Sequence, residues 1–482
     1  MIHSSYSTGS RTATGDSSRP TFDTIAAIAT PPGSGGVGII RISGPSSLNI
    51  LKSMFVPTER GFSGLIPRTL HFGQLLDDTG RAVDEALAVW FQAPRSFTGE
   101  DCVELHAHGG LAVLAALLDS ALARGARLAE RGEFTRRAFL NGKIDLSQAE
   151  AVAELIAAPS REGVYLASAK LEGLLGKRIA SLRSKLERLR QRVCLAIDFP
   201  DEDSISLPAQ EFAAAVSMIS KDIQSLLAGY ERARSWREGS LVVIAGRVNA
   251  GKSSLMNALL GRPRAIVTSQ PGTTRDYLEE QTHLAGLPVR LVDTAGLRWQ
   301  TDDPIEKEGI KRGMELAQNA RCILLVLDGA LSVPGKSPSE IFAEEKELAL
   351  QFGPTRCIPV WNKSDEEELP PDLEHFFGSQ VLPISALHGS GLDELCMEIR
   401  RRCLENSGEE EAILAPNLRQ ANALKLALED LCLLQKAIEE GMPADICGIH
   451  LESAAQRLAD VTGLNTTEET LNSIFSSFCI GK

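Results

Sequence analysis

The sequence predicts a multidomain protein of α/β plus α class, with an N-terminal α/β domain, a helical domain, and a second α/β domain inserted into the helical one. Three observations predict this arrangement. The chain has 482 residues, and two to four domains are expected at that length. Apolar residues follow a heptad pattern in its middle part. In its second half, short apolar runs alternate with helical patterns.

The composition is that of a globular protein, with 43% hydrophobic and 23% charged residues. A net charge of -13 argues against a protein that coats nucleic acid through bulk electrostatics, although a local basic patch remains possible. The nine cysteines form no CxxC pair, which indicates neither a zinc ribbon nor a disulfide scaffold, so a reduced, cytoplasmic setting is expected. The sequence contains no apolar run of about 18 residues, so no membrane span is predicted. Residues 1–20 are rich in Ser and Thr, which predicts a disordered extension.

Residues 21–141 predict the first α/β domain. The stretches 25–30, 37–42 and 86–91 have the apolar character of strands. Leucines then recur at helical spacing between residues 111 and 122.

Residues 142–238 and 405–482 predict the helical domain. Its apolar seam recurs in alternating steps of four and three, at Leu175, Ile179, Leu182, Leu186, Leu189 and Val193. Lysines and arginines lie between these positions, and they favour a solvated helix face, with contact to nucleic acid as the alternative. Helical spacing returns between Leu424 and Ile438 after an acidic linker at 407–411. Since each stretch has one apolar face to bury, the two should pack together, with residues 239–404 as an insertion.

The inserted part predicts a parallel sheet, because its apolar runs alternate with helical patterns. The expected strands are 241–245, 289–292, 322–327, 357–361 and 381–384.

A phosphate-binding loop follows the first of these strands. The segment from Gly246 to Ser253 reads G-x4-G-K-S and opens a helix, the context that a P-loop requires. Glycines let backbone N–H groups surround phosphates at a helix N-terminus. Lys252 supplies positive charge to the β- and γ-phosphates, and the Ser253 hydroxyl is suited to Mg²⁺.

Three further motifs identify the nucleotide. Asp293 to Gly296 ends a strand at the Walker-B position, where a carboxylate supports the metal. Asn362 to Asp365 follows another strand, and the Asp365 carboxylate can accept both N1–H and N2–H of guanine, which adenine lacks. Ser385 and Ala386 follow the last strand and suit a backbone clasp on the base. Four motifs in this order favour GTP over ATP and therefore predict a Ras-like G domain. Leu297 stands where Ras-like enzymes have a water-orienting Gln, so hydrolysis needs another device.

The chain resembles the TrmE (MnmE) family of tRNA-modification GTPases from Asp23 to its end. The GTPase motifs alone would fit many GTPases, but the other matching blocks are specific. These blocks are 30–33, 35–44, 96–101, 132–135, 137–143, 198–200, 271–276 and the ending Phe478-Cys479-Ile480-Gly481-Lys482. The resemblance implies an N-terminal tetrahydrofolate-binding domain, a helical domain and an inserted TrmE-type G domain.

The resemblance also implies an activity and partners. The family forms homodimers and joins the flavoprotein MnmG, which carries FAD, in a heterotetramer. Together they add a carboxymethylaminomethyl group at C5 of the wobble uridine (U34) of certain tRNAs, using K⁺-dependent GTP hydrolysis. The cofactors implied are Mg²⁺, K⁺ and a 5-formyl- or methylene-tetrahydrofolate. The alternative is a GTP-switch factor in ribosome assembly that performs no RNA chemistry.

Site residues follow from the same resemblance. Glu306 would position the attacking water, and Ser253 with Thr274 would hold Mg²⁺. Potassium would be held by Asn249, Thr268, Gln270 and Thr273, and folate by Arg41, Glu104, Lys143 and Lys482. Cys479 is either a buried free thiol or catalytic, and both readings stay open. The implied GTP-binding residues are Asn249, Ala250, Gly251, Lys252, Ser253, Ser254, Thr268, Ser269, Gln270, Pro271, Gly272, Thr273, Thr274, Asp293, Thr294, Ala295, Gly296, Asn362, Lys363, Ser364, Asp365, Ser385, Ala386 and Leu387.

Overall fold

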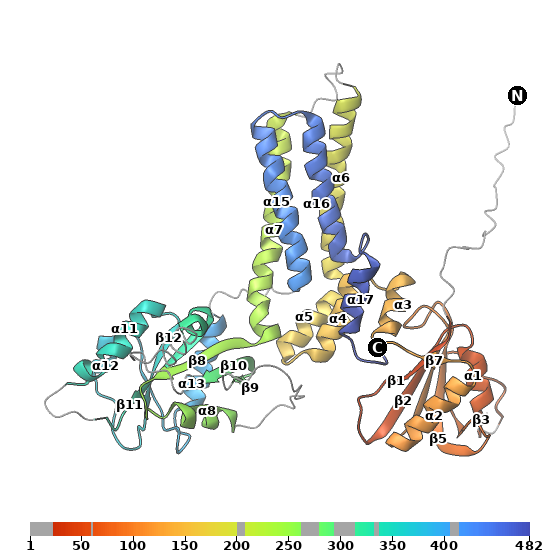
Figure 1. Ribbon diagram of the computed structural model, residues 1–482, viewed down its shortest axis with the longest axis horizontal. Coiled ribbons are helices and arrows are strands. Elements are labelled where there is room, and N and C mark those ends of the chain that lie inside the picture. Colours follow the sequence, from red (N-terminus) through yellow and green to blue (C-terminus); the bar gives the residue numbers. More distant parts are fainter. Residues whose placement is uncertain are drawn as a thin grey trace, which may run out of the picture. The chain divides into compact units, whose positions relative to one another are not determined.

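The computed structural model of the protein forms two compact units (Figure 1). One contains the described residues up to Ala149 together with Thr466–Lys482, and the other is Glu150–Asn465. The expected extension at 1–20 and the acidic linker at 407–411 lie outside the described residues. The structure describes residues 23–58, 61–199, 208–261, 279–293, 314–331, 337–404 and 414–482.

The first unit is built on a seven-stranded sheet in the order β3-β4-β5-β6-β2-β1-β7. Neighbouring strands are antiparallel except β1 and β7, which are parallel. The three predicted strands are confirmed as β1, β2 and β5. The strands are β1 (Ile25–Ile28), β2 (Gly35–Ser43), β3 (Phe55–Pro57), β4 (His71–Leu76), β5 (Ala82–Phe91), β6 (Cys102–Gly109) and β7 (Arg127–Leu128).

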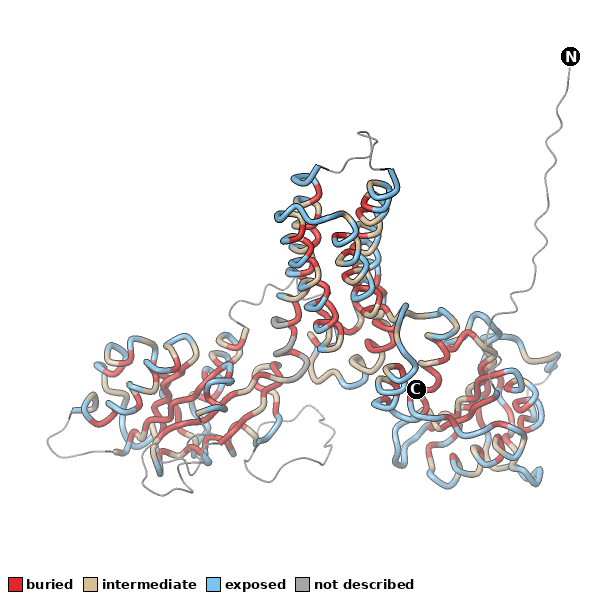
Figure 2. The backbone as a smooth tube through the Cα atoms, turned by 45° about the horizontal axis from the view of Figure 1, so that its top comes forward, coloured by how far each residue is buried: buried red, intermediate tan, exposed pale blue. Residues whose placement is uncertain are grey.

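Helices α1 (Ser47–Met54) and α2 (Leu111–Ala123) share the core of this sheet. The predicted helix is therefore confirmed as α2. Its residues Leu114 and Leu117 are buried against β-strand side chains such as Ile40, whereas Leu111 at its first turn is exposed. Burial runs along the strands and the inward faces of the helices (Figure 2).

The C-terminal segment belongs to the first unit. Helix α17 (Glu468–Ser476) packs on α3 (Glu133–Leu140), and Ile480 forms an antiparallel bridge with Arg131. The sequence predicts that this segment belongs to the helical domain, and the predicted domain boundaries stay a prediction. The structure adds that the last seventeen residues, 466–482, lie against the N-terminal sheet unit.

The helical part of the second unit has one shared core. The six seam residues of α6 are all buried, and they pack with apolar residues of α7, α15 and α16. These helices run side by side in Figure 1, which confirms that the two helical stretches pack together. Helix α4 (Leu146–Ala157) begins in the first unit and ends in the second. The other helices of this part are α5 (Arg161–Leu171), α6 (Leu174–Asp198), α7 (Ala209–Glu238), α15 (Leu418–Glu439) and α16 (Ala444–Thr462).

Several basic residues of α6 form ion pairs. Arg178 and Lys185 each lie 2.9 Å from a carboxylate oxygen of Asp222 on α7. Arg190 pairs with Glu187 one turn away, at 2.7 Å. These pairs favour a solvated, ion-paired helix face over contact with nucleic acid.

The inserted domain has a six-stranded sheet in the order β13-β12-β11-β8-β10-β9. Every neighbouring pair is parallel except β10 and β9. All five predicted strands are confirmed, and the antiparallel edge strand β9 was not predicted. The elements are β8 (Ser240–Gly246), α8 (Lys252–Leu260), β9 (Glu279–Leu284), β10 (Leu287–Asp293), β11 (Cys322–Asp328), α10 (Pro338–Ile341), α11 (Ala343–Phe352), β12 (Cys357–Asn362), α12 (Asp372–Phe377), β13 (Leu382–Pro383) and α13 (Leu392–Leu404).

Apolar residues cover both faces of this second sheet. Val242 and Ile244 of β8 belong to one buried cluster, while Val243 and Ala245 belong to another. Successive side chains of a strand point to opposite faces, so the continuous apolar run is explained by burial on both sides. None of the described helices combines the length and apolarity needed to cross a membrane.

Candidate functional site

The loop between β8 and α8 has a backbone that its glycines permit. Gly246 and Gly251 have φ angles of 143° and 89°, in the region that side chains disfavour. A Cβ atom at Gly246 would collide with the Val326 carbonyl, and one at Gly251 with the Asn362 amide. Asn249 also has a positive φ, at 65°. The loop therefore curls tightly at the N-terminus of α8, where backbone N–H groups favour anions.

Lys252 lies inside this loop. Its Nζ donates a hydrogen bond to the carbonyl of Arg247 at 2.7 Å. Burial lowers the pKa of Lys252, and the nearby Asp293 carboxylate opposes that change. The residue is only 7% exposed, so its charge is directed into the loop rather than toward solvent.

A hydroxyl and a carboxylate meet beside Lys252. The Ser253 hydroxyl donates to Asp293 Oδ2 at 2.8 Å, and Asp293 is the last residue of β10. The other oxygen, Oδ1, is buried and has no hydrogen-bond partner among the described residues. Hydroxyl and carboxylate oxygens are ligands that Mg²⁺ prefers, and the buried free oxygen leaves one acceptor available. These residues therefore fit a magnesium site.

Asn362 connects the P-loop to the segment after β13. Its side chain donates to the carbonyl of Ala250 at 2.9 Å and accepts from the N–H of Ala386 at 3.1 Å. The residue is 2% exposed. Its neighbour Lys363 has a φ of 63° and pairs with Asp328 at 2.7 Å. The third and fourth motifs are thereby fixed to the first.

The carboxylate of Asp365 is held ionised. A hydrogen bond from the Ser385 side chain lowers the pKa of Asp365, and burial opposes that change. His388 Nε2 lies 3.6 Å from Asp365 Oδ2, and its backbone N–H donates to the Ser385 hydroxyl. An ionised carboxylate offers acceptors only, which suits a ligand edge with adjacent N–H donors. Leu387 beside it is 80% exposed.

The structure brings the described members of the GTP set to one edge of the sheet. The P-loop follows β8, Asp293 is the last residue of β10, and Asn362 is the last residue of β12. These parallel strands have their carboxyl ends at the same edge of the sheet. Ser254 lies in α8, and Ser364 donates its N–H to the carbonyl of Ile384. The remaining residues lie outside the described part of the chain: Thr268, Ser269, Gln270, Pro271, Gly272, Thr273, Thr274, Thr294, Ala295, Gly296, Leu297 and Glu306.

Two residues of this site, Asp328 and His388, were not predicted from the sequence. Asp328 is the last residue of β11, at the same sheet edge, and it binds the lysine of the third motif. A carboxylate that directly follows an apolar run was a signal that could have found it. His388 follows Leu387, and no motif indicated it.

A second polar cluster lies in the first unit. Arg41 Nη2 is 2.8 Å from Glu104 Oε1, and Arg41 Nη1 donates to the Gly481 carbonyl at 3.3 Å. The guanidinium also lies 5.5 Å from the ring centre of Phe97 and 5.7 Å from that of Phe134. Arg41 and Glu104 face each other across β2 and β6, because their strand register pairs them directly.

The C-terminal tail completes this cluster. The Lys482 carbonyl accepts from the N–H of Phe134 at 3.2 Å. Burial lowers the pKa of Lys482, and the positive charge of Arg41 lowers it further. Lys143 instead donates to the Pro94 carbonyl at 3.1 Å. The structure thus gathers Arg41, Glu104 and Lys482, and it places Lys143 against the loop that carries Phe97.

Cys479 lies in the same tail as a free thiol, and it is exposed. The reading of Cys479 as a buried thiol is therefore wrong, because the tail crosses the surface of the sheet unit at this point. Its carbonyl accepts from the N–H of Gly132 at 3.4 Å, so the backbone is anchored while the side chain stays accessible.

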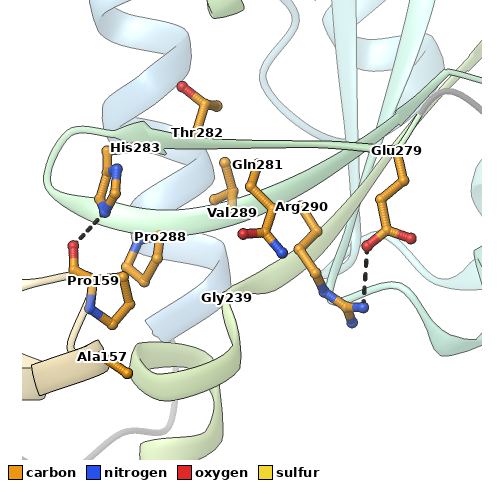
Figure 3. Close-up of a pocket in the computed structure, with 10 residues that line it drawn as sticks. All are labelled: Ala157, Pro159, Gly239, Glu279, Gln281, Thr282, His283, Pro288, Val289 and Arg290. Atoms are coloured by element: carbon orange, nitrogen blue, oxygen red, sulfur yellow. Dashed lines mark hydrogen bonds and ion pairs between the residues drawn. The ribbon is translucent and has the colours of Figure 1, made fainter. Parts of the chain in front are cut away.

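A cavity of about 450 Å³ lies elsewhere, between the β9–β10 hairpin and the α4–α5 connection (Figure 3). The His283 ring hydrogen-bonds to the Pro159 carbonyl, and Arg290 pairs with Glu279 at 3.3 Å. None of the predicted site residues lines it. The lining residues are Ala157, Pro159, Gly239, Glu279, Gln281, Thr282, His283, Pro288, Val289 and Arg290.

Two family models match the chain. The model described as "GTP-binding protein TrmE N-terminus" matches residues 24–143. The model described as "MnmE helical domain" matches residues 146–479, a span that includes the inserted domain.

Full-length relatives agree with these models. The tRNA modification GTPase MnmE of Nitratidesulfovibrio vulgaris (strain Hildenborough) is 51% identical over 95% of this chain and 99% of its own length. The tRNA modification GTPase MnmE of Lawsonia intracellularis is 48% identical over 95% of this chain and 100% of its own length. Among solved structures, the G domain of the T. maritima FeoB iron transporter is 27% identical, covering 34% of this chain and 98% of that chain at a TM-score of 0.26. The resemblance noted in the sequence is confirmed, and the chain belongs to the TrmE (MnmE) family of tRNA modification GTPases.

Proposed function

We propose that this protein binds and hydrolyses GTP, and that it uses this reaction in the modification of tRNA. The observation that carries the proposal is the Asn362 amide, which joins the phosphate-binding loop at Ala250 to the base-side segment at Ala386. One buried side chain thereby ties together two loops that a single nucleotide would span. The near full-length match to tRNA modification GTPases supports the assignment to tRNA.

Base selection is assigned to Asp365. Its ionised carboxylate would accept the N1–H and N2–H donors of guanine together, while the Ala386 segment covers the base. Adenine offers no such donor pair. A site built for paired hydrogen bonds rejects an analogue that lacks them by about 10⁴ or more.

The phosphates would lie against the loop N–H groups and the Lys252 ammonium. Ser253, Asp293 and Thr274 would hold Mg²⁺, which neutralises charge on the β- and γ-phosphates. The Ser253 hydroxyl supports this assignment, and so does the buried Asp293 Oδ1, which has no hydrogen-bond partner in the part of the chain that the structure describes.

Hydrolysis is proposed to need K⁺ and a carboxylate. Asn249, Thr268, Gln270 and Thr273 would hold the ion, which supplies positive charge near the bridging oxygen as an arginine finger does elsewhere. Glu306 would align the attacking water, since Leu297 cannot.

A tetrahydrofolate is proposed for the first unit. The Glu104 carboxylate suits the amino and ring N–H donors of a pterin, and cationic side chains suit a glutamate tail. Arg41 and Lys482, with Lys143 at the neighbouring loop, supply those cations. On binding, the ion pair between Arg41 and Glu104 would give way to contacts between each of these side chains and the ligand.

The proposed reaction is the addition of a carboxymethylaminomethyl group at C5 of the wobble uridine of certain tRNAs. The protein would act as a cytoplasmic homodimer and would join MnmG, with its FAD, in a heterotetramer. This assembly and this reaction come from the family and fit the near full-length match of the chain.

The test is mass analysis of wobble nucleosides from a strain that lacks the gene, with and without the gene restored. Loss of the modified uridine, restored by the wild-type chain but not by Asp365→Asn, is the expected result. Unchanged nucleosides together with altered ribosomal subunit profiles would favour the ribosome-assembly alternative. GTP turnover by the purified protein, measured beside these, separates failure of GTP hydrolysis from failure of the tRNA assignment.

A further inference from the structure

The side chain of Arg247 leaves the phosphate-binding loop and reaches helix α11. Arg247 Nε lies 2.8 Å from Glu345 Oε1, in the first turn of that helix. The neighbouring Glu344 lies 3.6 Å from Arg247 Nη2, and its side chain is 68% exposed. The loop is therefore bound to a helix that carries none of the nucleotide motifs.

Glu345 is almost fully buried, with 2% of the residue exposed. Burying a carboxylate is costly unless a positive partner offsets the lost hydration. Its second oxygen, Oε2, has no hydrogen-bond partner within the ranges that the structure describes. Arg247 is the cation beside this carboxylate: burial, the larger effect, raises the pKa of Glu345, and the charge of Arg247 opposes that change.

The start of α11 is fixed from its other side. Phe342, the residue that caps the helix, packs edge-on against Trp361 with ring centres 5.8 Å apart. Trp361 directly precedes Asn362, and both rings belong to one buried cluster with Val243 and Ala245 of β8. The first turn of α11, which carries Glu345, is therefore packed into the same core as β8, the strand that precedes the phosphate-binding loop.

Arg247 also shapes the inside of the loop. Its carbonyl accepts a hydrogen bond from the Lys252 ammonium at 2.7 Å and another from the Ala250 N–H at 3.3 Å. A displacement of Arg247 would move the acceptor of the lysine that faces the phosphates. Side chain and carbonyl of one residue thereby join α11 to the centre of the phosphate site.

We propose that Glu345 is a positioning residue for nucleotide binding, which holds the phosphate-binding loop in its curled form through Arg247. This inference rests on the GTP binding proposed above. The buried Glu345 should affect nucleotide binding, and the exposed Glu344 should not.

The test measures dissociation of a fluorescent nucleotide, N-methylanthraniloyl-GDP, from the full-length protein by stopped flow. In Glu345→Gln the charge that holds Arg247 is lost, and dissociation should speed up about tenfold, which corresponds to about 1.4 kcal/mol. Glu344→Gln is the matched control, one residue away on the same helix, and its rate should stay within about twofold of wild type because surface pairs contribute little. Circular dichroism at the assay temperature verifies that each variant is folded.

A double-mutant cycle tests the route through Arg247. Arg247→Met should speed dissociation to a similar extent, and adding Glu345→Gln to it should change little more. If Glu345→Gln does not fold, Arg247→Met carries the test alone, since its side chain is one-third exposed. Equal rates in wild type and the two single variants would overturn the inference while leaving GTP binding intact, and so would additive effects. A wild-type protein that fails to bind the nucleotide would overturn the proposed function and the inference with it.

Discussion

Asn362→Ala removes the side chain that joins the two halves of the nucleotide site. The amide makes two hydrogen bonds, to the Ala250 carbonyl and from the Ala386 N–H, and the residue is 2% exposed. Neither partner is itself a charged group. The substitution therefore neither adds nor removes a charge at the phosphate site, and its main effect is to loosen the connection between the two loops.

The size of the effect follows from those two bonds. Each contributes about 0.5–1.5 kcal/mol net, and a buried partner left unsatisfied costs about 1–3 kcal/mol. The truncated side chain leaves room for water, which can satisfy part of that loss. The nucleotide then has to order two loops that were joined before it bound. Affinity for GDP should fall about 10- to 100-fold, or about 1.4–2.8 kcal/mol.

The assay is titration calorimetry with GDP, together with the thermal unfolding of each variant. Asn319→Ala is the control, because it removes an exposed amide that donates to the Glu315 carbonyl of its own helix. That variant should bind GDP as wild type does. An affinity of Asn362→Ala within about twofold of wild type, in a folded protein, would refute the reasoning that this amide organises the site.

Four other substitutions test separate parts of the molecule. Asp365→Asn should weaken GTP binding steeply and strengthen binding of xanthosine triphosphate, as measured by competition with a fluorescent nucleotide. Hydrolysis should fall when K⁺ is replaced by Na⁺, and phosphate-release assays on Asn249→Ala should show no difference between the two salts. Glu306→Ala should bind GTP normally but turn it over at least about 10²-fold more slowly, and a wild-type rate would exclude it as the water-aligning residue. Arg419→Met should lower the free energy of unfolding by about 3 kcal/mol in urea titrations, because it leaves the buried Glu150 carboxylate without the cation 2.6 Å away.

Long regular patterns were readable from the sequence. The α6 seam repeats through the length of the helix, and every one of its six residues is buried. The strands of the inserted sheet are also plain, because burial on both faces makes each a continuous apolar run. The stretch at 322–327 shows this, and all of β11 except its last residue is buried. Patterns of this kind reflect burial directly, so no knowledge of the partner elements is needed to interpret them.

Elements whose burial is partial gave no such signal. Strand β9 reads Glu-Glu-Gln-Thr-His-Leu, and its first three residues are exposed at the edge of the sheet. It is a strand because β10 offers it hydrogen bonds along its whole length, which is a property of the neighbour. The family resemblance placed Lys482 with Arg41 and Glu104, but no apolar pattern indicated that residues 466–482 pack with the N-terminal sheet unit, since the partner lies more than 300 residues away in the chain.

The residues of the nucleotide site fall into the same two groups, those that a sequence pattern predicts and those that it does not. Groups that touch phosphate or base are set by local backbone geometry, so Gly251 and Lys252 must stand side by side in the sequence and a motif finds them. Residues that hold those groups in place need only lie close to them in the folded protein, so they have no fixed spacing in the sequence. Glu345 and Asp328 come from a helix and a strand with no motif of their own, and each binds one cation of the loops, Arg247 or Lys363. A loop that binds a charged ligand with a curled backbone needs such anchoring, because an unanchored loop would lose ordering entropy at every binding event. The affinity of this site should therefore depend on residues that the motifs never name, and Glu345 is the one whose burial makes that dependence measurable.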